Sequence, residues 1–338
     1  MFSNLSRASL CTWSGHFRSS VSYRTLALAG AALALGLTGT ANAANFTASN
    51  ETELVAAINQ ANASGDASST ITLTGGLALS GAPLPQITKN LTIDSAGNTI
   101  TSARTVVLDV SSGTNLTYNG KIAVTGSNRF TVSGAGTVTL TGSDTVVNGN
   151  GGMWLGSSDG ATLNLENGSK FLSGTLVTIA QAKTDSAVLN VTGAGSLLEG
   201  PVRVEQGNAV INIRNGGQIS GSAVHIGVTT SYTTPDANNP IDRGGSADIL
   251  VSDAGSRWDS TNPFILLRGS LSILNSGVVQ AGSMRIGFSN SRVTSDAIAE
   301  VLVSGAGSQL ITTNTVANSF AIGGGTGNFV KKGVTTRK

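Results

Sequence analysis

Short alternations of apolar and polar residues recur along most of the chain. Each runs for three to five residues and is bounded by Gly, Ser, Asn or Asp. The clearest examples are Ile71–Leu73, Leu91–Ile93, Val138–Leu140, Leu163–Leu165 and Ile211–Ile213. A period of two places apolar side chains on one face of a strand, and small turn residues end it. No helical pattern separates these segments, which argues against a doubly wound α/β fold and predicts an all-β chain.

One helix is predicted ahead of the first alternating segment. Asn50 suits an N-cap, and Glu53 follows it by three residues, as in a capping box. The apolar stripe that follows is Leu54, Val55 and Ile58. Gly65 is expected to end the helix. We expect residues 44–68 to form an N-terminal cap, because the first coil of a stacked structure needs cover; the alternative is a surface helix without a capping role.

An internal repeat organises the rest of the chain. Residues 187–227 align without a gap with residues 247–287, and a third copy occupies 299–333. The matched turn positions are Gly195, Ser196, Asn215 and Gly217 in the first copy, and Gly255, Ser256, Asn275 and Gly277 in the second. Self-similarity of this kind is typical of solenoids, in which each repeat packs only on its neighbours.

The spacing within the repeat predicts the fold. Gly195 precedes Gly217 by 22 positions, and Gly255 precedes Gly277 by the same interval. About 22 residues suits one coil of a right-handed parallel β-helix, in which equivalent turns stack about 4.8 Å apart. We expect this solenoid over residues 69–333, with roughly 12–13 coils at that length per coil. Residues 228–246 are polar, contain two prolines and are predicted to form a loop.

The N-terminus has the three parts of an export signal. Residues 1–25 carry basic side chains and no acid, Leu26–Gly39 is rich in Leu, Ala and Gly, and a small-x-small site ends at Ala43. This predicts a signal peptide over residues 1–43, cleaved between Ala43 and Ala44, with the Sec export machinery as a partner. A membrane anchor is the alternative, but the apolar run is shorter than the roughly 20 residues that span a bilayer.

Charge and cysteine content argue against nucleic-acid binding and against cysteine-based sites. Without residues 1–43 the chain has 17 basic and 18 acidic residues, so no basic stripe is available for nucleic acid. The single cysteine, Cys11, lies inside the predicted signal peptide. The mature chain then has no disulfide and no cysteine-based metal site.

The sequence contains few candidate catalytic residues. His225 is the one histidine after the signal peptide, and its alternating segment predicts that it faces the surface. Asp248, Asp253 and Asp259 lie in the second repeat, and a carboxylate cluster is conceivable near Asp253 and Asp259, although separate solvated turn acids are the simpler interpretation. Gly323–Gly327 lacks the context of a phosphate loop. We therefore predict no catalytic, cofactor-binding or metal-binding residue and no cofactor. The large rings are Trp154, Trp258 and Phe264, and Trp258 is predicted to pack in the core or the turn rather than to form a sugar platform.

Three segments carry a family resemblance. The sequences VTGAGSLLEG, VSDAGSRWDS and INIRNGGQIS resemble passenger domains of Gram-negative autotransporters, the type V secretion family. The resemblance implies a parallel β-helix at the cell surface or secreted, acting as a stalk or adhesin toward a host surface or neighbouring cells. Parallel β-helices also serve as polysaccharide lyases and hydrolases, so a β-helical polysaccharide lyase or glycoside hydrolase is the alternative.

The resemblance also sets an expectation for the C-terminus. Such proteins end in a translocator β-barrel, and this chain has no sequence of that kind. Phe329–Gly333 resembles the beginning of a passenger motif that is complete at Phe130–Leu140. Residues 334–338 lose the alternation and turn basic. We expect an incomplete autotransporter with an aberrant tail, which would reach the periplasm while the intact protein would reach the cell surface.

Overall fold

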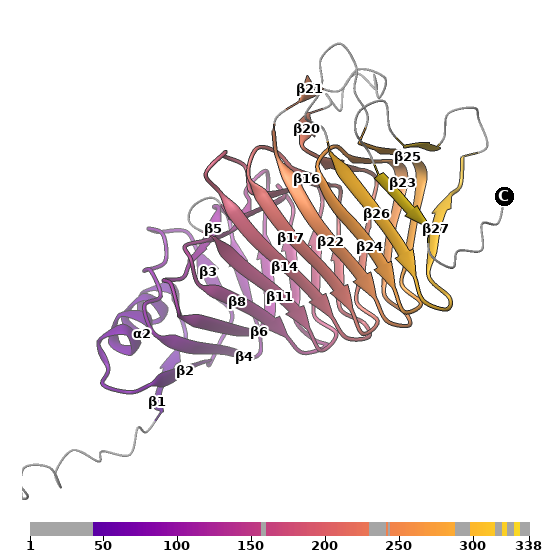
Figure 1. Ribbon diagram of the computed structural model, residues 1–338. Helices are drawn as coiled ribbons and strands as arrows, with labels where there is room; N and C mark the ends of the chain where they lie inside the picture. The colour runs from indigo at the N-terminus through magenta and orange to yellow at the C-terminus, as the bar shows by residue number, and fades with distance from the viewer. Residues whose placement is uncertain are drawn as a thin grey trace, which may run out of the picture. The chain divides into compact units, whose positions relative to one another are not determined.

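The strands stack in parallel as the rungs of a β-solenoid (Figure 1). The computed structural model describes residues 43–156, 160–229, 241–242, 244–287, 298–314, 320–322 and 328–331. The predicted signal peptide up to residue 42, the Gly323–Gly327 segment and the predicted tail 334–338 lie outside the described residues. Within the described ones, 27 strands join one hydrogen-bonded sheet that winds over three faces. The predicted parallel β-helix is confirmed.

Face A contains the longest run of rungs. Its strands are β1 (Ala44–Ala48), β2 (Ser68–Leu73), the first parts of β4 (Asn90–Ser102) and β6 (Asn115–Val124), β8 (Thr137–Thr141), β11 (Ala161–Glu166), β14 (Ser186–Thr192), β17 (Asn208–Arg214), β22 (Ser246–Ser252), β24 (Gly269–Leu274), β26 (Ala299–Ser304) and β29 (Asn328–Lys331). All five alternating segments quoted from the sequence lie on this face.

Faces B and C complete each coil. Face B consists of β3 (Leu77–Leu79), the second parts of β4 and β6, β9 (Val146–Gly149), β12 (Lys170–Ser173), β15 (Leu197–Glu199), β18 (Gln218–Gly221), the first parts of β23 (Arg257–Leu266) and β25 (Val278–Ile286), and β27 (Gln309–Thr312). Face C consists of β5 (Val106–Asp109), β7 (Phe130–Ser133), β10 (Met153–Leu155), β13 (Val177–Ile179), β16 (Val202–Val204), β19 (Val224–Ile226), the second parts of β23 and β25, and β28 (Phe320–Ile322).

The coils vary in length more than the repeat suggested. Ala187 pairs with Ala209, 22 positions later, whereas Leu163 pairs with Leu189, 26 positions later. Ala209 pairs with Ala247, 38 positions later, because an insertion lies between them. The coil length is therefore not the constant 22 residues from which 12–13 coils were expected. Part of the insertion is an antiparallel pair of β20 (Val228–Thr229) and β21 (Ile241–Asp242).

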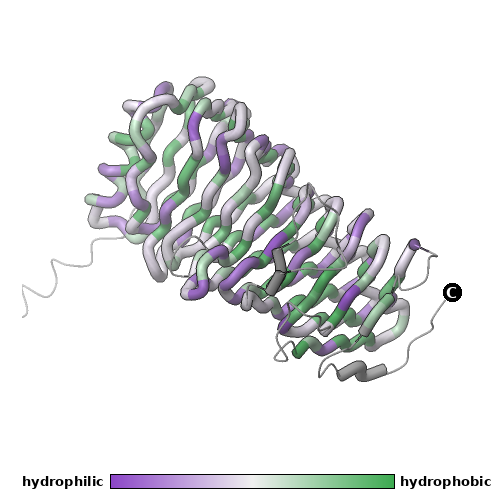
Figure 2. The backbone as a smooth tube through the Cα atoms, turned by 90° about the horizontal axis from the view of Figure 1, so that it is seen from above, coloured by the Kyte–Doolittle hydropathy of each residue, from purple (hydrophilic) through white to green (hydrophobic). Residues whose placement is uncertain are grey.

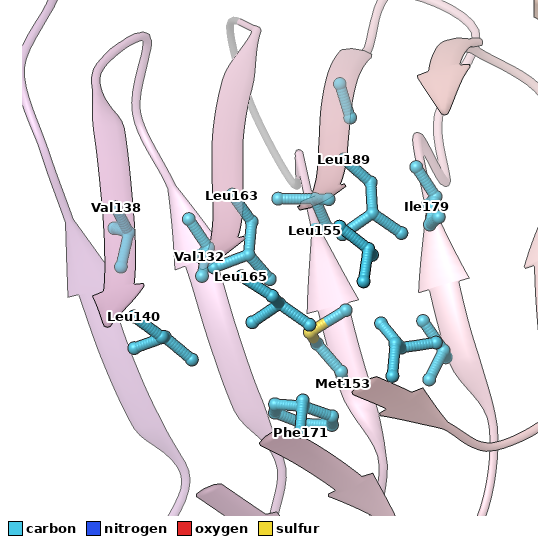
Figure 3. Packing of buried hydrophobic residues seen from close by; sticks show 14 of the residues in the cluster. Val132, Val138, Leu140, Met153, Leu155, Leu163, Leu165, Phe171, Ile179 and Leu189 are labelled. Carbon is cyan, nitrogen blue, oxygen red and sulfur yellow. The ribbon is translucent and has the colours of Figure 1, made fainter. Parts of the chain in front are cut away.

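The core is a stack of like side chains (Figure 3). On face A, Leu163, Leu189 and Ile211 occupy one inward row, and each is fully buried. Phe130 and Phe171 meet inside the coil with ring centroids 5.6 Å apart. Burial of each such side chain stabilises the fold by about 1.5–3 kcal/mol, so the repeated row is the main source of stability. Green and pale segments alternate along each strand in Figure 2, as a strand with one buried face requires.

Helix α2 (Glu51–Ala63) covers the first coil (Figure 1). The side chain of Asn50 accepts a hydrogen bond from the amide of Glu53 at 3.0 Å, as the predicted N-cap requires. Leu54, Ala57, Ile58 and Ala61 are its buried residues. The helix ends at Ala63, with Ser64 as C-cap, rather than at Gly65. Strand β1, which the sequence analysis did not predict, precedes the helix and pairs with β2.

Two side chains join the helix to the solenoid. The Glu51 carboxylate accepts hydrogen bonds from the amides of Ser80 and Gly81 and pairs with Arg104 at 3.0 Å. Asn62, near the other end, donates to the Gln86 carbonyl at 2.7 Å and accepts from the Thr88 amide at 2.9 Å. These contacts fix both ends of the helix against the start of the solenoid.

Candidate functional site

The predicted turn positions all lie at the corner between faces A and B. Two turn lengths alternate along the stack. A four-residue turn such as Gly193–Ser196 joins β14 to β15, and a three-residue turn such as Asn215–Gly217 joins β17 to β18. Residues 253–256 and Asn275–Gly277 repeat this pair in later coils. The tandem repeat seen in the sequence is therefore a repeat of two coils, one with each turn.

The serines of the four-residue turns connect neighbouring coils. Ser196 Oγ accepts a hydrogen bond from the Gly168 amide at 3.0 Å and donates to the Thr192 carbonyl at 2.8 Å. Ser256 Oγ accepts from the Gly216 amide at 3.0 Å. Both serine side chains are fully buried. Each hydroxyl satisfies a buried amide of the preceding coil, which costs free energy if left unpaired.

Two more residues form the same bridge, and Thr145 was not predicted from the sequence. Thr145 Oγ1 accepts from the Gly120 amide at 2.9 Å, and Ser308 Oγ accepts from the Ser276 amide at 3.2 Å. Each also donates to the carbonyl four residues earlier. The signal that finds them is a hydroxyl residue at the last position of each four-residue turn. The turn that contains Thr145, Gly142–Thr145, lacks the Ala-Gly-Ser sequence of the other four-residue turns.

Two different physical reasons require glycine at the predicted turn positions. Gly195 and Gly255 have φ of 83° and 84°, a left-handed backbone that L side chains rarely adopt. Gly217 and Gly277 are crowded instead, since a Cβ would lie 2.1 Å from the Val191 carbonyl oxygen in the first case and 2.3 Å from that of Val251 in the second. Backbone conformation therefore requires glycine at Gly195 and Gly255. Close contact with the preceding coil requires it at Gly217 and Gly277.

The predicted asparagines also use left-handed backbone. Asn215 has a φ of 52° and Asn275 a φ of 50°. Three other asparagines form a ladder on the outer side of face A. Asn190 donates to Asn164, and Asn212 donates to Asn190, each at 2.8 Å. The amides of this ladder bond to one another across coils and add to the rung hydrogen bonds.

His225 is not on the surface, and the sequence prediction for it is wrong. It does point outward from β19, but only 4% of it is exposed. Its outward neighbour in the next coil, Ile265, is completely buried. Face C is therefore covered at this point. Burial, together with the charge of Arg203, lowers the pKa of His225 to about 4, so the imidazole is neutral at pH 7.

The candidate acids lie in three different places. Asp248 is on the outer side of face A and accepts from Ser270 Oγ at 2.8 Å. Asp253 lies in the turn, where its carboxylate accepts from Ser252 Oγ at 3.1 Å. Asp259 is on face B and is paired with Arg257. These three residues do not share a face, and within the described ranges no group of three or more His, Cys, Asp or Glu residues is arranged to hold a metal ion.

The large rings take two different positions. Trp258 and Phe264 are buried in the core, with centroids 5.3 Å apart in an edge-to-face arrangement. Trp154 points outward from β10 and lies under the guanidinium of Arg129, 4.4 Å from the ring centroid. The prediction that Trp258 packs rather than forming a sugar platform is confirmed.

One groove opens at the corner between faces B and C. It has a volume of about 400 Å³ and crosses four successive coils. Its lining residues are Val124, Thr125, Asn148, Asn150, Leu172, Ser173, Gly174 and Glu199. Glu199 is the only ionisable side chain among them. No sequence pattern predicts this groove, because it arises from residues that are about 25 positions apart and meet only through coil stacking.

The predicted cleavage site lies directly before the first strand. Ala43 is the first described residue and Ala44 begins β1. Among the described residues, no helix has the length and apolar character needed to cross a membrane.

Comparison with known proteins finds an informative relative. The chain is 30% identical over 146 residues to the protein named Adhesin BmaC autotransporter of Brucella suis biovar 1 (strain 1330). The match covers 42% of this chain and 4% of that adhesin, so the chain corresponds to a small part of the relative's length. No protein-family model matches the chain, and no solved structure matches it significantly.

Proposed function

We propose that this chain is passenger sequence of an autotransporter, and that the intact protein acts at the cell surface as a non-catalytic stalk or adhesin. The observation that carries the proposal is the 30% identity over 146 residues to a protein named as an autotransporter adhesin. The parallel β-solenoid supports it, because the fold agrees with the one that the sequence resemblance implied.

The geometry suits a spacer that also presents a surface. Rungs continue from coil to coil, and the hydroxyls of Ser196 and Ser256 connect neighbouring turns. Each coil extends the stack by about 4.8 Å while its side chains repeat in rows on the outside. Such a structure holds exposed side chains at fixed spacing, which is what a binding surface on a stalk needs.

The alternative is a β-helical polysaccharide lyase or glycoside hydrolase. That chemistry uses carboxylates held together over the substrate. The three candidate aspartates, Asp248, Asp253 and Asp259, lie in a strand of face A, in a turn and in a strand of face B. This arrangement favours the non-catalytic proposal over an active site built from those residues.

The proposal is tested by locating the protein on cells. Antibodies raised against the solenoid are applied to intact and to permeabilised cells of the source organism. We expect labelling of intact cells, loss of labelling after brief external protease treatment, and weaker attachment to host cells or neighbouring cells when the gene is deleted. Labelling that appears only after permeabilisation would contradict a surface role.

Export is tested separately by sequencing the N-terminus of the exported protein. We propose that the Sec machinery exports the chain and that the mature protein begins at Ala44. A mature N-terminus that retains the apolar run before Ala43 would contradict the proposed cleavage and favour an anchor.

A further inference from the structure

The groove between faces B and C forms because the turns at this corner become shorter along the stack. Five residues separate β6 from β7, three separate β9 from β10, three separate β12 from β13, and two separate β15 from β16. Longer turns at one end and short ones at the other leave a recess over the four coils. The recess is part of the regular solenoid and does not depend on the insertion.

Three polar side chains of the groove are free to bind, whereas the hydroxyls of Thr125 and Ser173 donate to backbone carbonyls. No intramolecular hydrogen bond or ion pair is formed by the side chains of Asn148, Asn150 or Glu199 within the described part of the chain, and all three are exposed. The amide of Asn128, in the neighbouring turn, donates to the Ala103 and Thr125 carbonyls at 2.8 and 2.9 Å. The groove thus collects donors and acceptors that the fold itself does not use.

The backbone around the groove argues against a peptide ligand. Extended peptides bind by adding a strand to an open sheet edge. Strand β9 is paired with β6 and β12, and β12 is paired with β9 and β15. No open edge is present at these strands, so a ligand must be recognised by side chains. Carboxamide, hydroxyl and carboxylate groups beside the apolar Leu172 match the hydroxyls and the C–H faces of a sugar.

Size and charge narrow the class of sugar. A volume of about 400 Å³ lies within the range of small-molecule sites and suits one or two sugar rings. Glu199 is the only ionisable group in the lining, and no cationic side chain lines the groove. A carboxylate without a cationic partner repels uronate and sialate residues.

We infer that this groove binds a one- or two-residue segment of a neutral glycan, with Asn148, Asn150 and Glu199 hydrogen-bonded to its hydroxyl groups. The inference rests on the proposed adhesin function for its biological setting, since a glycan is then what the stalk attaches to. The site is a binding site only, and no bond is made or broken in it.

The test measures binding of defined disaccharides to the purified full chain. Lactose, N,N′-diacetylchitobiose and digalacturonic acid are compared by saturation-transfer NMR and by calorimetry. We expect at least one of the two neutral sugars to bind and digalacturonic acid not to bind. Asn148→Ala and Glu199→Ala should each weaken the neutral sugar about tenfold, because each removes a hydrogen-bonding group.

Gln218→Ala is the matched control. Gln218 lies on the outer side of face B, is exposed and is outside the groove. It should leave sugar binding unchanged. Absence of binding by both neutral sugars, preference for the acidic sugar, or equal binding by the groove variants and the parent would overturn the inference. If intact cells are labelled and any of those binding results is obtained, the glycan site is contradicted. The proposed stalk function is not contradicted by that combination.

Discussion

The hydroxyl of Ser196 accepts a hydrogen bond from the amide of Gly168, which lies 28 positions earlier in the chain, at 3.0 Å. The two residues belong to neighbouring turns, and the serine is fully buried. The Oγ atom of Ser196 therefore connects its four-residue turn to the three-residue turn of the preceding coil. Ser256 accepts the same hydrogen bond from the Gly216 amide, so the contact recurs along the solenoid.

Replacing Ser196 with alanine should destabilise the protein by about 1–3 kcal/mol, because the buried Gly168 amide loses its acceptor. The free energy of unfolding, measured by urea denaturation, checks this. Ser196→Thr should stay close to the parent, since Thr145 already forms this bridge in an earlier coil. Ser220→Ala is the control, because that side chain forms no hydrogen bond in the described structure. Equal midpoints for Ser196→Ala and Ser220→Ala would contradict the role of the bridge.

The two kinds of turn glycine should respond differently to asparagine. At Gly195, φ is 83° and an added Cβ would come no closer than 3.4 Å to its nearest neighbour, the Gly168 Cα. Gly195→Val should therefore lower the free energy of unfolding by about 1–3 kcal/mol. Gly195→Asn should lower it clearly less, because Asn tolerates left-handed backbone. At Gly217 both Ala and Asn should cost about 1–3 kcal/mol or more, because their Cβ would lie 2.1 Å from the Val191 oxygen. Thermal and urea unfolding of the four variants tests this. A Gly217→Asn protein as stable as the parent would show that the turn can move away from Val191.

Glu51 should make the capping helix sensitive to acid. Hydrogen bonds from the amide of Ser80 and from Arg104 and Gly81 lower the pKa of its carboxyl, although partial desolvation opposes them. A lowered pKa in the folded state means that this stabilisation is complete above the ordinary glutamate pKa and is lost as the pH falls through the lowered value. Amide hydrogen exchange of α2 should therefore be slower in the parent than in Glu51→Gln at pH 7, and the difference should shrink as the pH approaches 3. Asp66→Asn, which removes a carboxylate that forms no hydrogen bond or ion pair in the described structure, should show no such difference.

His225 should add a second acid sensitivity at higher pH. Burial and Arg203 lower its pKa from 6.5 to about 4. The unfolded chain therefore binds a proton below pH 6.5 that the folded chain resists, and stability falls progressively from pH 6.5 down to about 4. The loss is on the order of 3 kcal/mol. His225→Gln, which cannot titrate, should show a flatter dependence of unfolding free energy on pH over this range. Parallel pH profiles for the two proteins would place the histidine in water rather than in a covered site.

Local sequence patterns predicted the strands, the turns and the capped helix, which depend on the direction of neighbouring side chains. Alternation at segments such as Leu163–Leu165 identified strands and their buried faces, because successive side chains in a strand point to opposite sides wherever the strand lies. The 22-residue interval between Gly195 and Gly217 indicated coils and the serine and glycine positions of their turns. A capped helix at Asn50 followed from the same local chemistry.

Stacking decided what depends on residues far apart in the chain. The amide of Gly168 could not be assigned to Ser196 from the sequence, because three- and four-residue turns alternate and shift the partner. His225 points outward as its alternation predicts, yet it is buried because the outside of face C is covered there. The groove with Glu199 exists because turns of different length lie side by side in successive coils. Side-chain direction is a property of each strand alone, whereas burial and binding surfaces depend on which coil, turn or insertion lies against it, and only the tertiary structure supplies that neighbour.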